Sequence, residues 1–356
     1  MKKVLFLSAI AAMAMASCSN DQEIEGLKTN DQLIDFSVLT TRSLPVTTNS
    51  ELQGTTFKAW GFTPAGVAYL GETDGVDVSY SNGSWTYTPK KSWPSEALNF
   101  VALNPATHEK LTEVNMTSSS QTVKYEVATD VEQQVDVMYA VKQNQTKSSN
   151  PVNLVFKHAL AQVAFKATTT DPKYTAEIGS IEVHNLKNKG TFTFPKTDTQ
   201  AGFGIGAGSW NLEEDTYANY PVGLQGTNSV SITSAGQVIT ANDGVLMPLP
   251  QAFTAWKTSK SKAVAIKQAD ESKHGYLKIQ LKLKENDTYL VGSATDFVTV
   301  YMPFGYTWEM GKKYIYNLKF GNGAGYDENG DPILQFIEFN PDVDPWIEVE
   351  VVDIEM

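Results

Sequence analysis

Residues 277–284 read Leu-Lys-Ile-Gln-Leu-Lys-Leu-Lys, a strict alternation of apolar and polar side chains. Successive side chains of a β-strand point to opposite faces of the sheet, so this alternation predicts a strand whose leucines and isoleucine lie in the core. The lysines and the glutamine are then expected to form a face in water. A helix would instead carry its apolar residues every third or fourth position.

The same period of two recurs along the chain in residues 34–40, 123–127 and 135–141. Residues 76–80 and 85–87 also alternate, and Ser81-Asn82-Gly83-Ser84 between them has the composition of a hairpin turn. No long stretch has the helical period of 3.6. Many short strands with Gly, Pro and Asn turns are typical of sandwiches or barrels, so we expect an all-β fold.

The chain has 356 residues, enough for two domains of ordinary size. The polar segment Thr168–Lys173, which contains Pro172, is the expected boundary, giving domains 43–170 and 171–356. Just before it the apolar residues change from even to odd positions. A bulge or turn near His158 to Ala161 explains that change of phase.

The N-terminus has the composition of a signal peptide, residues 1–17. Two lysines precede an apolar run that is too short to span a membrane, and small residues precede Cys18, which is the chain's only cysteine. We expect export, with lipid attached to Cys18 and anchoring to the outer membrane. The alternative is an ordinary signal peptide with a cysteine there by chance, because Met15 departs from the usual leucine.

The charge excludes some partners. The formal net charge is −12, and removal of Lys2 and Lys3 takes it to −14. An acidic protein is repelled by nucleic acid and by anionic membrane surfaces, so neither is expected as a partner.

No catalytic motif stands out in the sequence. The four histidines, His108, His158, His184 and His274, have no metal-ligand spacing, and no nucleophile elbow or phosphate loop is present. His158 lies in an apolar segment and is expected to be a hydrogen-bonded core residue. We therefore expect no enzymatic activity and no cofactor.

One metal candidate follows from spacing. Asp327, Asn329, Asp331 and Glu338 occupy positions 1, 3, 5 and 12 of a calcium-loop template. Pro332 stands where that template needs glycine, and no helix flanks the loop. The alternative is a hairpin turn over residues 327–332.

Residues 346–356 form a strongly apolar C-terminal segment. It is either a last strand in its own sheet or a strand donated to a neighbouring subunit, in which main-chain hydrogen bonds give affinity and alternate side chains fill pockets. Its inward-facing candidates are Trp346, then Ile347, Val349 and Val351 on one face, and Val352, Ile354 and Met356 on the other.

A strand near the N-terminus is the matching candidate plug. Residues 34–40 are followed by Thr41-Arg42-Ser43. A cut after Arg42 would leave Ser43 as the new N-terminus and remove residues 18–42, lipid and strand together. Its removal would open a groove for a donated strand.

The chain resembles the fimbrillin family, lipoprotein precursors of type V pili from Gram-negative anaerobes. The resemblance rests on Ile34-Asp35-Phe36-Ser37 with Thr41-Arg42, then Phe57–Gly61, Trp85–Tyr87, Lys91–Pro94, Leu98–Ala102, Leu154–Val163 and Trp308–Tyr316. It implies two transthyretin-like β-sandwich domains in tandem, export as a lipoprotein, and a final location in a cell-surface fimbrium that serves cell adhesion.

The resemblance also implies roles for single residues and partners. Cys18 is then the lipid site, Arg42 the cut made by an extracellular arginine-directed protease, and the segment from Trp346 the donor. The partners are identical or homologous pilus subunits. Stalk, anchor and tip roles stay open, and an anchor keeps its lipid.

Two other functions stay open. A monomeric surface lipoprotein could bind glycans through tryptophans that look exposed, namely Trp85, Trp93, Trp210 and Trp256. A lipid-anchored hydrolase would need an acidic pair in a cleft, and the sequence selects no such pair.

Overall fold

The computed structural model describes residues 32–40, 52–201, 204–241, 244–256, 263–321, 323–334 and 339–345. Its helical pieces are short, among them the 3-10 turn η1 (Val131–Gln133) and the six-residue α2 (Ile266–Glu271), and no described helix has the length and apolar character to cross a membrane. The all-β prediction is confirmed. The strands are β1 (Phe36–Thr40), β2 (Thr56–Phe62), β3 (Ala68–Leu70), β4 (Val76–Ser81), β5 (Ser84–Thr86), β6 (Leu98–Asn104), β7 (Leu111–Met116), β8 (Gln121–Glu126), β9 (Met138–Gln145), β10 (Val152–His158), β11 (Gln162–Thr169), β12 (Tyr174–Lys187), β13 (Lys189–Thr193), β14 (Ser209–Leu212), β15 (Tyr217–Pro221), β16 (Val230–Ile232), β17 (Gln237–Val238), β18 (Tyr276–Glu285), β19 (Thr288–Val291), β20 (Val298–Pro303), β21 (Lys312–Phe320) and β22 (Phe339–Pro345).

The alternating stretch 277–284 lies in β18, as predicted. Leu277, Ile279, Leu281 and Leu283 are all 0% exposed, and β12 and β20 pair with β18 on its two sides. The opposite face is drier than expected. Lys282 is only 8% exposed, because its Nζ lies 4.3 Å from the ring centroid of Phe297 and donates to the Ala294 carbonyl.

The predicted hairpin is β4 and β5. Ser81 pairs with Ser84, and the two residues between them, Asn82 and Gly83, have φ values of 51° and 84°. Positive φ at both central positions suits the right-handed twist of the flanking strands, and Asn-Gly adopts it at little cost. Local chemistry therefore decides this hairpin.

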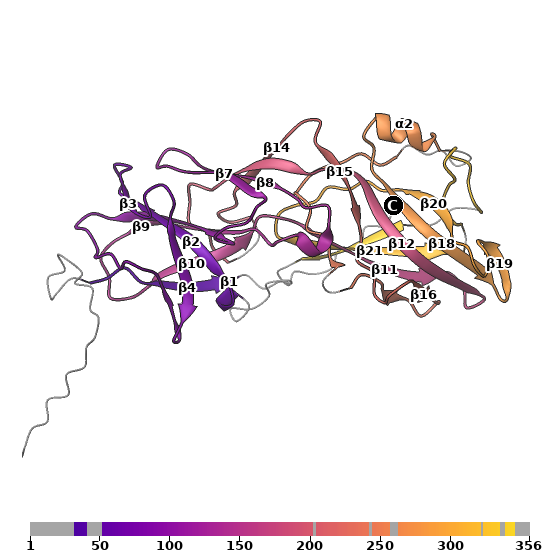
Figure 1. Ribbon diagram of the computed structural model, residues 1–356, viewed down its shortest axis with the longest axis horizontal. Helices are drawn as coiled ribbons and strands as arrows, with labels where there is room; N and C mark the ends of the chain where they lie inside the picture. The colour runs from indigo at the N-terminus through magenta and orange to yellow at the C-terminus, as the bar shows by residue number, and fades with distance from the viewer. Residues whose placement is uncertain are drawn as a thin grey trace, which may run out of the picture.

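The strands of the N-terminal half close into a ring. The sheet order is β3-β2-β4-β5-β1-β10-β9-β6, and β6 also pairs with β2, so every strand but β3 belongs to a closed circuit. Aromatic and aliphatic side chains fill the interior, among them Phe57, Phe100, Leu154 and Phe156, each 0% exposed. In Figure 1 these strands, coloured from indigo to magenta, occupy one end of an elongated molecule.

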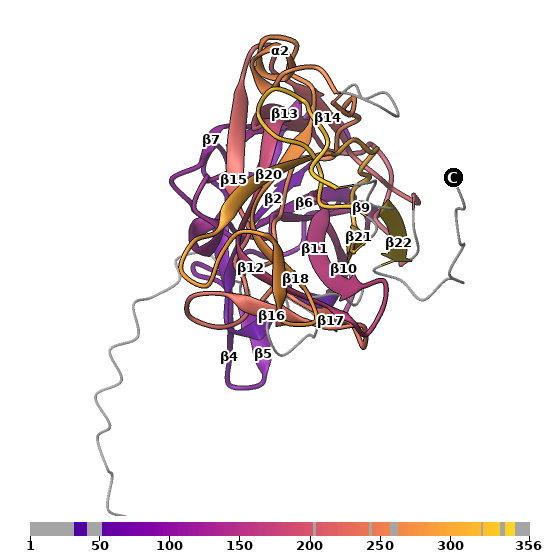
Figure 2. The ribbon, with the colours of Figure 1, turned by 90° about the vertical axis from the view of Figure 1, so that its right-hand side faces the viewer.

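The C-terminal half consists of two packed sheets. One has the order β17-β11-β21-β22, and the other contains β15, β12, β18 and β19 with β16 and β20. Figure 2 shows β12, β18 and β20 on one side and β11, β21 and β22 on the other. Phe165 and Tyr316 from the first sheet share a core cluster with Ile279 and Leu281 from the second.

A fourth sheet joins chain segments from both sides of residue 170. Its order is β14-β13-β8-β7, so β13 pairs with β8 of the N-terminal half and β14 extends the sheet beyond β13. In the other direction, β11 precedes residue 170 and pairs with β21. The division into domains 43–170 and 171–356 stays a prediction.

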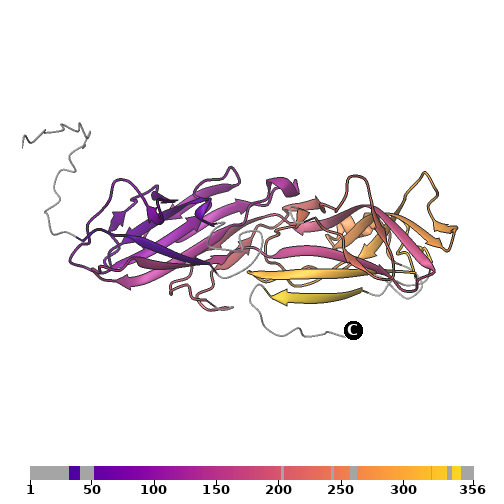
Figure 3. The same ribbon diagram turned by 90° about the horizontal axis from the view of Figure 1, so that it is seen from below.

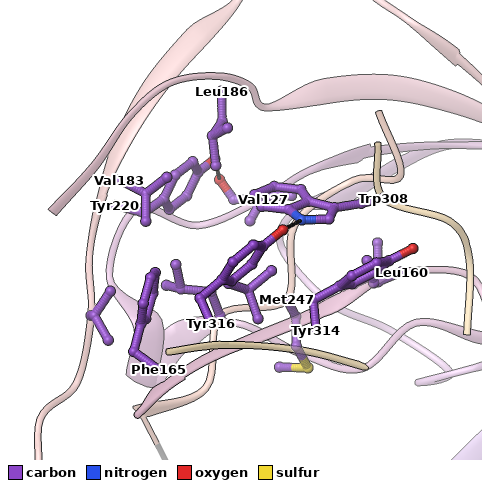
Figure 4. Packing of buried hydrophobic residues seen from close by; sticks show 14 of the residues in the cluster. Val127, Leu160, Phe165, Val183, Leu186, Tyr220, Met247, Trp308, Tyr314 and Tyr316 are labelled. Carbon is purple, nitrogen blue, oxygen red and sulfur yellow. Dashed lines mark hydrogen bonds between the residues drawn. The ribbon is translucent and has the colours of Figure 1, made fainter. Parts of the chain in front are cut away.

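The two halves are joined by a short buried crossover, residues 159–161. β10 ends at His158 and β11 begins at Gln162, so a turn between two sheets explains the change of phase. Ala159 N donates to Val137 O at 2.8 Å, and Gly311 N donates to Leu160 O at 2.8 Å. Figure 4 shows Val127 and Leu160 of the first half among Tyr220, Tyr314 and Trp308 of the second.

His158 is a core residue, as predicted. It is 3% exposed, and its Nδ1 lies 2.6 Å from Asp136 Oδ2. The segment that supplies Asp136 is not a strand: the expected strand 135–141 begins only at Met138, because η1 and the loop after it precede β9.

Candidate functional site

β1, the strand that precedes Arg42, closes the ring of the N-terminal half. It runs parallel to β10, with Phe36 opposite Val152 and Thr40 opposite Phe156. On its other side Phe36 pairs with Trp85 of β5. Without β1, β5 and β10 would face each other across a gap one strand wide.

The residues just before β1 continue these contacts. Ile34 N donates to Lys91 O at 2.9 Å, and Trp93 N donates to Gln32 O at 2.9 Å. On the opposite side Val152 N donates to Asp35 O at 2.8 Å. The segment 32–40 is therefore hydrogen-bonded along both edges, as an inner strand is.

One face of this segment is buried and the other is not, as the alternation predicted. Ile34, Phe36 and Val38 are 0%, 4% and 8% exposed, whereas Leu39 is 48% exposed. The first three point into the ring and fill it. We call the channel that they occupy, between residues 85–93 and β10, the β1 groove.

The centre of the β1 groove is an aromatic pocket around Phe36. The ring centroid of Phe36 lies 5.6 Å from that of Phe100, 5.8 Å from Tyr87 and 6.4 Å from Phe57. The contacts with Phe100 and Phe57 are edge-to-face, an arrangement that the ring quadrupoles favour. We call these three rings the Phe36 pocket.

Polar side-chain contacts fix the segment near its N-terminal end. The Tyr87 hydroxyl donates to the Ile34 carbonyl at 3.0 Å, and Lys90 forms an ion pair with Asp35. Burial raises the pKa of Tyr87 to about 12, so its hydroxyl keeps its proton at neutral pH. The ion pair is half in water, with the Asp35 side chain 52% exposed, and contributes little.

The processing residues predicted from the sequence, Cys18, Arg42 and Ser43, lie outside the described residues. The sequence holds one signal that was missed. Arg42 is the only arginine among the 28 basic residues of the chain, so the other 27 are lysines. An arginine-directed protease has a single cleavage site in this chain.

The predicted donor residues, Trp346, Ile347, Val349, Val351, Val352, Ile354 and Met356, also lie outside the described residues. The strand before them, β22, ends at Pro345, is antiparallel to β21 and comes last in the order of the described strands of its sheet. Figure 3 shows β22 in yellow along one edge of the C-terminal half. The β1 groove lies in the other half.

The calcium candidate forms a turn. Asp327 Oδ1 accepts hydrogen bonds from Asn329 N at 2.9 Å and Asp331 N at 2.8 Å, and Tyr326 bridges to Pro332. Glu338 lies outside the described residues, and within them no three His, Cys, Asp or Glu side chains are grouped to hold a metal. The Asp327 carboxylate thus accepts hydrogen bonds from the backbone of its own turn.

The tryptophans proposed for glycan binding are not exposed. Trp85 and Trp93 are each 7% exposed and Trp256 is 1% exposed, while Trp210 is half-buried with its Nε1 donating to the Ala159 carbonyl. That expectation was wrong, because large rings between sheets gain more by burial than on the surface.

A polar cluster lies on the sheet of β12 and β18. Glu182 Oε2 is 2.9 Å from His184 Nε2 and 3.3 Å from Lys278 Nζ. Burial lowers the pKa of His184, and the ring stacks on Tyr276 at 4.5 Å. The Glu182 carboxylate thus has one cationic partner, Lys278, and a histidine whose neutral form is favoured by burial, which suits a polar cluster that covers the sheet.

Comparison with known proteins gives a consistent result. A family model described as fimbrillin-like matches residues 41–346. Comparison with curated proteins found no match.

Several solved structures are similar to this chain. A fimbrial protein from Bacteroides vulgatus is 17% identical with a TM-score of 0.61, over 88% of this chain and 99% of that chain. A candidate cell adhesion protein from Parabacteroides distasonis is 11% identical with a TM-score of 0.48, over 89% and 97%. One from Bacteroides uniformis is 13% identical with a TM-score of 0.46, over 89% and 100%. The first shares the fold, and the family model covers most of the sequence: the chain belongs to the fimbrillin-like family.

Proposed function

We propose that this chain is the precursor of a fimbrial subunit that assembles by strand exchange and serves cell adhesion. In this proposal it reaches the outer membrane as a lipoprotein with lipid on Cys18, and an extracellular arginine-directed protease cuts after Arg42. The segment from Trp346 of a neighbouring subunit then pairs with β10. The observation that carries the proposal is the position of β1, an inner strand directly before Arg42.

Connectivity supports removal of β1. The chain reaches β1 from Cys18 on one side and leaves it through Arg42 on the other, so one cut there ends its covalent attachment to the body. Since residues 32–40 make hydrogen bonds along both edges, their release leaves two unpaired strand edges that another strand can satisfy.

The single arginine supports a limited cut. Lysine serves everywhere else, including ion pairs such as Lys124 with Glu213 and Lys142 with Asp198. A protease specific for arginine therefore detaches the segment and leaves the subunit whole, even when the protease is in excess.

Magnitudes support exchange after the cut and retention before it. Burial of Ile34, Phe36 and Val38 contributes roughly 5–9 kcal/mol in all. Ordering the backbone of a free segment costs about 1–2 kcal/mol per residue, so the total cost for the segment 32–40 is as large as the gain from burial or larger. Once β1 is no longer part of the chain, its association also costs translational freedom, so a competing strand can replace it.

The domains 43–170 and 171–356 are then two transthyretin-like sandwiches in tandem, and the subunit has a structural role without catalysis. Its partners are other pilus subunits.

The experiment compares three forms of the full-length chain after treatment with an arginine-specific endopeptidase. Wild type should be cut once and form oligomers, and Arg42→Lys should stay uncut and monomeric. The matched control is Arg42→Lys with Lys147→Arg, which moves the cut to the exposed loop between β9 and β10 without freeing β1. It should be cut but stay monomeric by size-exclusion chromatography.

The proposal is wrong if wild type cut after Arg42 stays monomeric with its C-terminus intact, or if the control oligomerises equally. The N-terminal residue of subunits in sheared fibres gives a second measurement. Ser43 supports a processed polymer subunit, whereas a lipidated Cys18 identifies a retained anchor.

A further inference from the structure

The Phe36 pocket has fixed walls. Phe57 contacts Phe156 and Trp85, each with ring centroids 5.1 Å apart, and Phe100 contacts Trp93 at 5.9 Å. These rings are held by neighbours other than Phe36. A smaller side chain at the centre of the groove therefore leaves a cavity, because a well-packed wall collapses only in part.

The positions beside the centre have a different character. Ile34 and Val38, two residues to either side of Phe36, are both β-branched aliphatic residues. The strand that fills the groove thus presents aliphatic, aromatic and aliphatic side chains at every second position. Because the side chains of a strand alternate between faces, a donor has to reproduce this order at the same spacing.

The chain's own C-terminal segment matches the groove in charge. With Ile347, Val349 and Val351 inward, Glu348 takes the position of Asp35 opposite Lys90. With Val352, Ile354 and Met356 inward, Asp353 takes that position. Both registers keep an acidic residue near the lysine, and both are compatible with the aliphatic ends.

The same C-terminal segment does not match the Phe36 pocket at the centre of the β1 groove in side-chain shape. The residue placed in the Phe36 pocket is Val349 in one register and Ile354 in the other. The segment's only aromatic residue is Trp346, and centring it brings Asp344 and Glu348 to the two apolar flanking positions. No register of this segment combines a central aromatic side chain with apolar neighbours.

We propose that the β1 groove selects donor strands with an aromatic side chain at the central inward position, and so binds a donor of that sequence from a different subunit more tightly than the C-terminal segment of a second copy. This inference rests on the strand exchange proposed above. A phenyl ring replaced by valine in a fixed pocket loses buried area and leaves a void, so we expect at least about a tenfold difference in Kd.

The experiment measures peptide binding by fluorescence anisotropy to the full-length chain after the cut at Arg42 and removal of the released segment, at a concentration below that at which the cut chain forms oligomers. The probes are residues 32–41, residues 344–356, and the second peptide with Val349→Phe or with Ile354→Phe. Two variants of the first peptide form a matched pair: Phe36→Val changes the inward centre, and Leu39→Val changes a side chain that is 48% exposed.

We expect residues 32–41 to bind at least about tenfold more tightly than residues 344–356, and one of the two phenylalanine substitutions to recover most of that difference. Phe36→Val should lose about tenfold or more, and Leu39→Val less than about twofold. The substitution that recovers affinity also identifies the register.

The selectivity inference is overturned if residues 344–356 bind as tightly as residues 32–41 and neither phenylalanine improves them. Strand exchange would still stand in that case, with the second copy as donor. If no peptide binds, the groove does not accept strands, and both proposals fail.

Discussion

Two strand pairs in the described part of the chain are parallel, β1 with β10 and β11 with β21, and the proposed assembly makes the first replaceable and the second permanent. β1 matches β10 over five residues, and β11 matches β21 over eight, from Gln162 opposite Lys313 to Thr169 opposite Phe320. Both bury aromatic residues: Phe36 is 4% exposed and Phe165 is 0% exposed. Burial therefore does not distinguish the two pairs.

Connectivity does distinguish them. β11 is held in the chain by β10 before it and β12 after it, so no single cut in a flanking segment frees it. β1 is joined covalently to the rest of the fold only through the segment that contains Arg42. A well-packed strand can thus be a permanent part of a core or a replaceable one, depending on how its two ends are connected.

The largest effect should come from removing one ring from each pair. Phe36→Ala and Phe165→Ala should each lower the free energy of unfolding of the uncut chain by about 3–5 kcal/mol, because each leaves a cavity. After the cut at Arg42 and release of β1, the Phe36→Ala difference should vanish while that of Phe165→Ala persists. Guanidinium denaturation of cut and uncut chains measures both.

A persistent Phe36→Ala effect in the cut chain would mean that β1 stays bound after cleavage. Leu39→Ala, which changes an exposed side chain of the same strand, is the control and should change stability by less than about 0.5 kcal/mol.

An intermediate effect is expected from the Tyr87 hydroxyl, which joins β1 to its neighbours. Tyr87→Phe removes the hydrogen bond to the Ile34 carbonyl and should cost about 0.5–1.5 kcal/mol in the uncut chain. Burial raises the pKa of Tyr87 to about 12 from an ordinary value near 10, so the neutral form is favoured in the folded state. Its contribution is complete below pH 10 and is lost as the pH rises from 10 to 12.

The rate at which the cut segment dissociates should therefore rise between pH 10 and 12 in wild type, measured by release of a labelled N-terminal segment. Tyr87→Phe should dissociate faster at neutral pH and show less of this rise. If both proteins respond equally to pH, the titrating group lies elsewhere.

The smallest effect should come from Asp35 and Lys90. Their ion pair is exposed, so Asp35→Asn should change stability by less than about 1 kcal/mol. The difference should disappear in 1 M salt, where charges are screened within about 3 Å. A large, salt-independent loss would show that the Asp35 side chain contributes more than a screened surface charge.

Local pattern predicted the elements well. The alternation in 277–284, the segment before Arg42 and the Asn82-Gly83 turn all gave strands or turns where expected, because side-chain period and turn chemistry are properties of neighbouring residues. The hydrogen-bonded core role of His158 followed from its apolar surroundings.

Properties set by distant segments were not predictable in the same way. Phe36 and Val152 are paired across more than a hundred residues of sequence, and nothing local encodes that partner or its parallel direction. The burial of Trp85, Trp93 and Lys282 likewise depends on which sheets and loops cover them. The single arginine could be counted in the sequence, but only the position of β1 indicates that a cut there would free an inner strand.

The buried crossover 159–161 has a mechanical consequence. If a neighbour's strand pairs with β10 as β1 does, a pull on a fibre enters the subunit along β10 and passes covalently through Ala159, Leu160 and Ala161 into β11. From there it crosses the β11–β21 ladder to β22, which leads to the segment that the next subunit would hold. The force runs along these strands, so their hydrogen bonds are loaded together in shear rather than opened one at a time, and the joint between the halves is itself part of the tensile element.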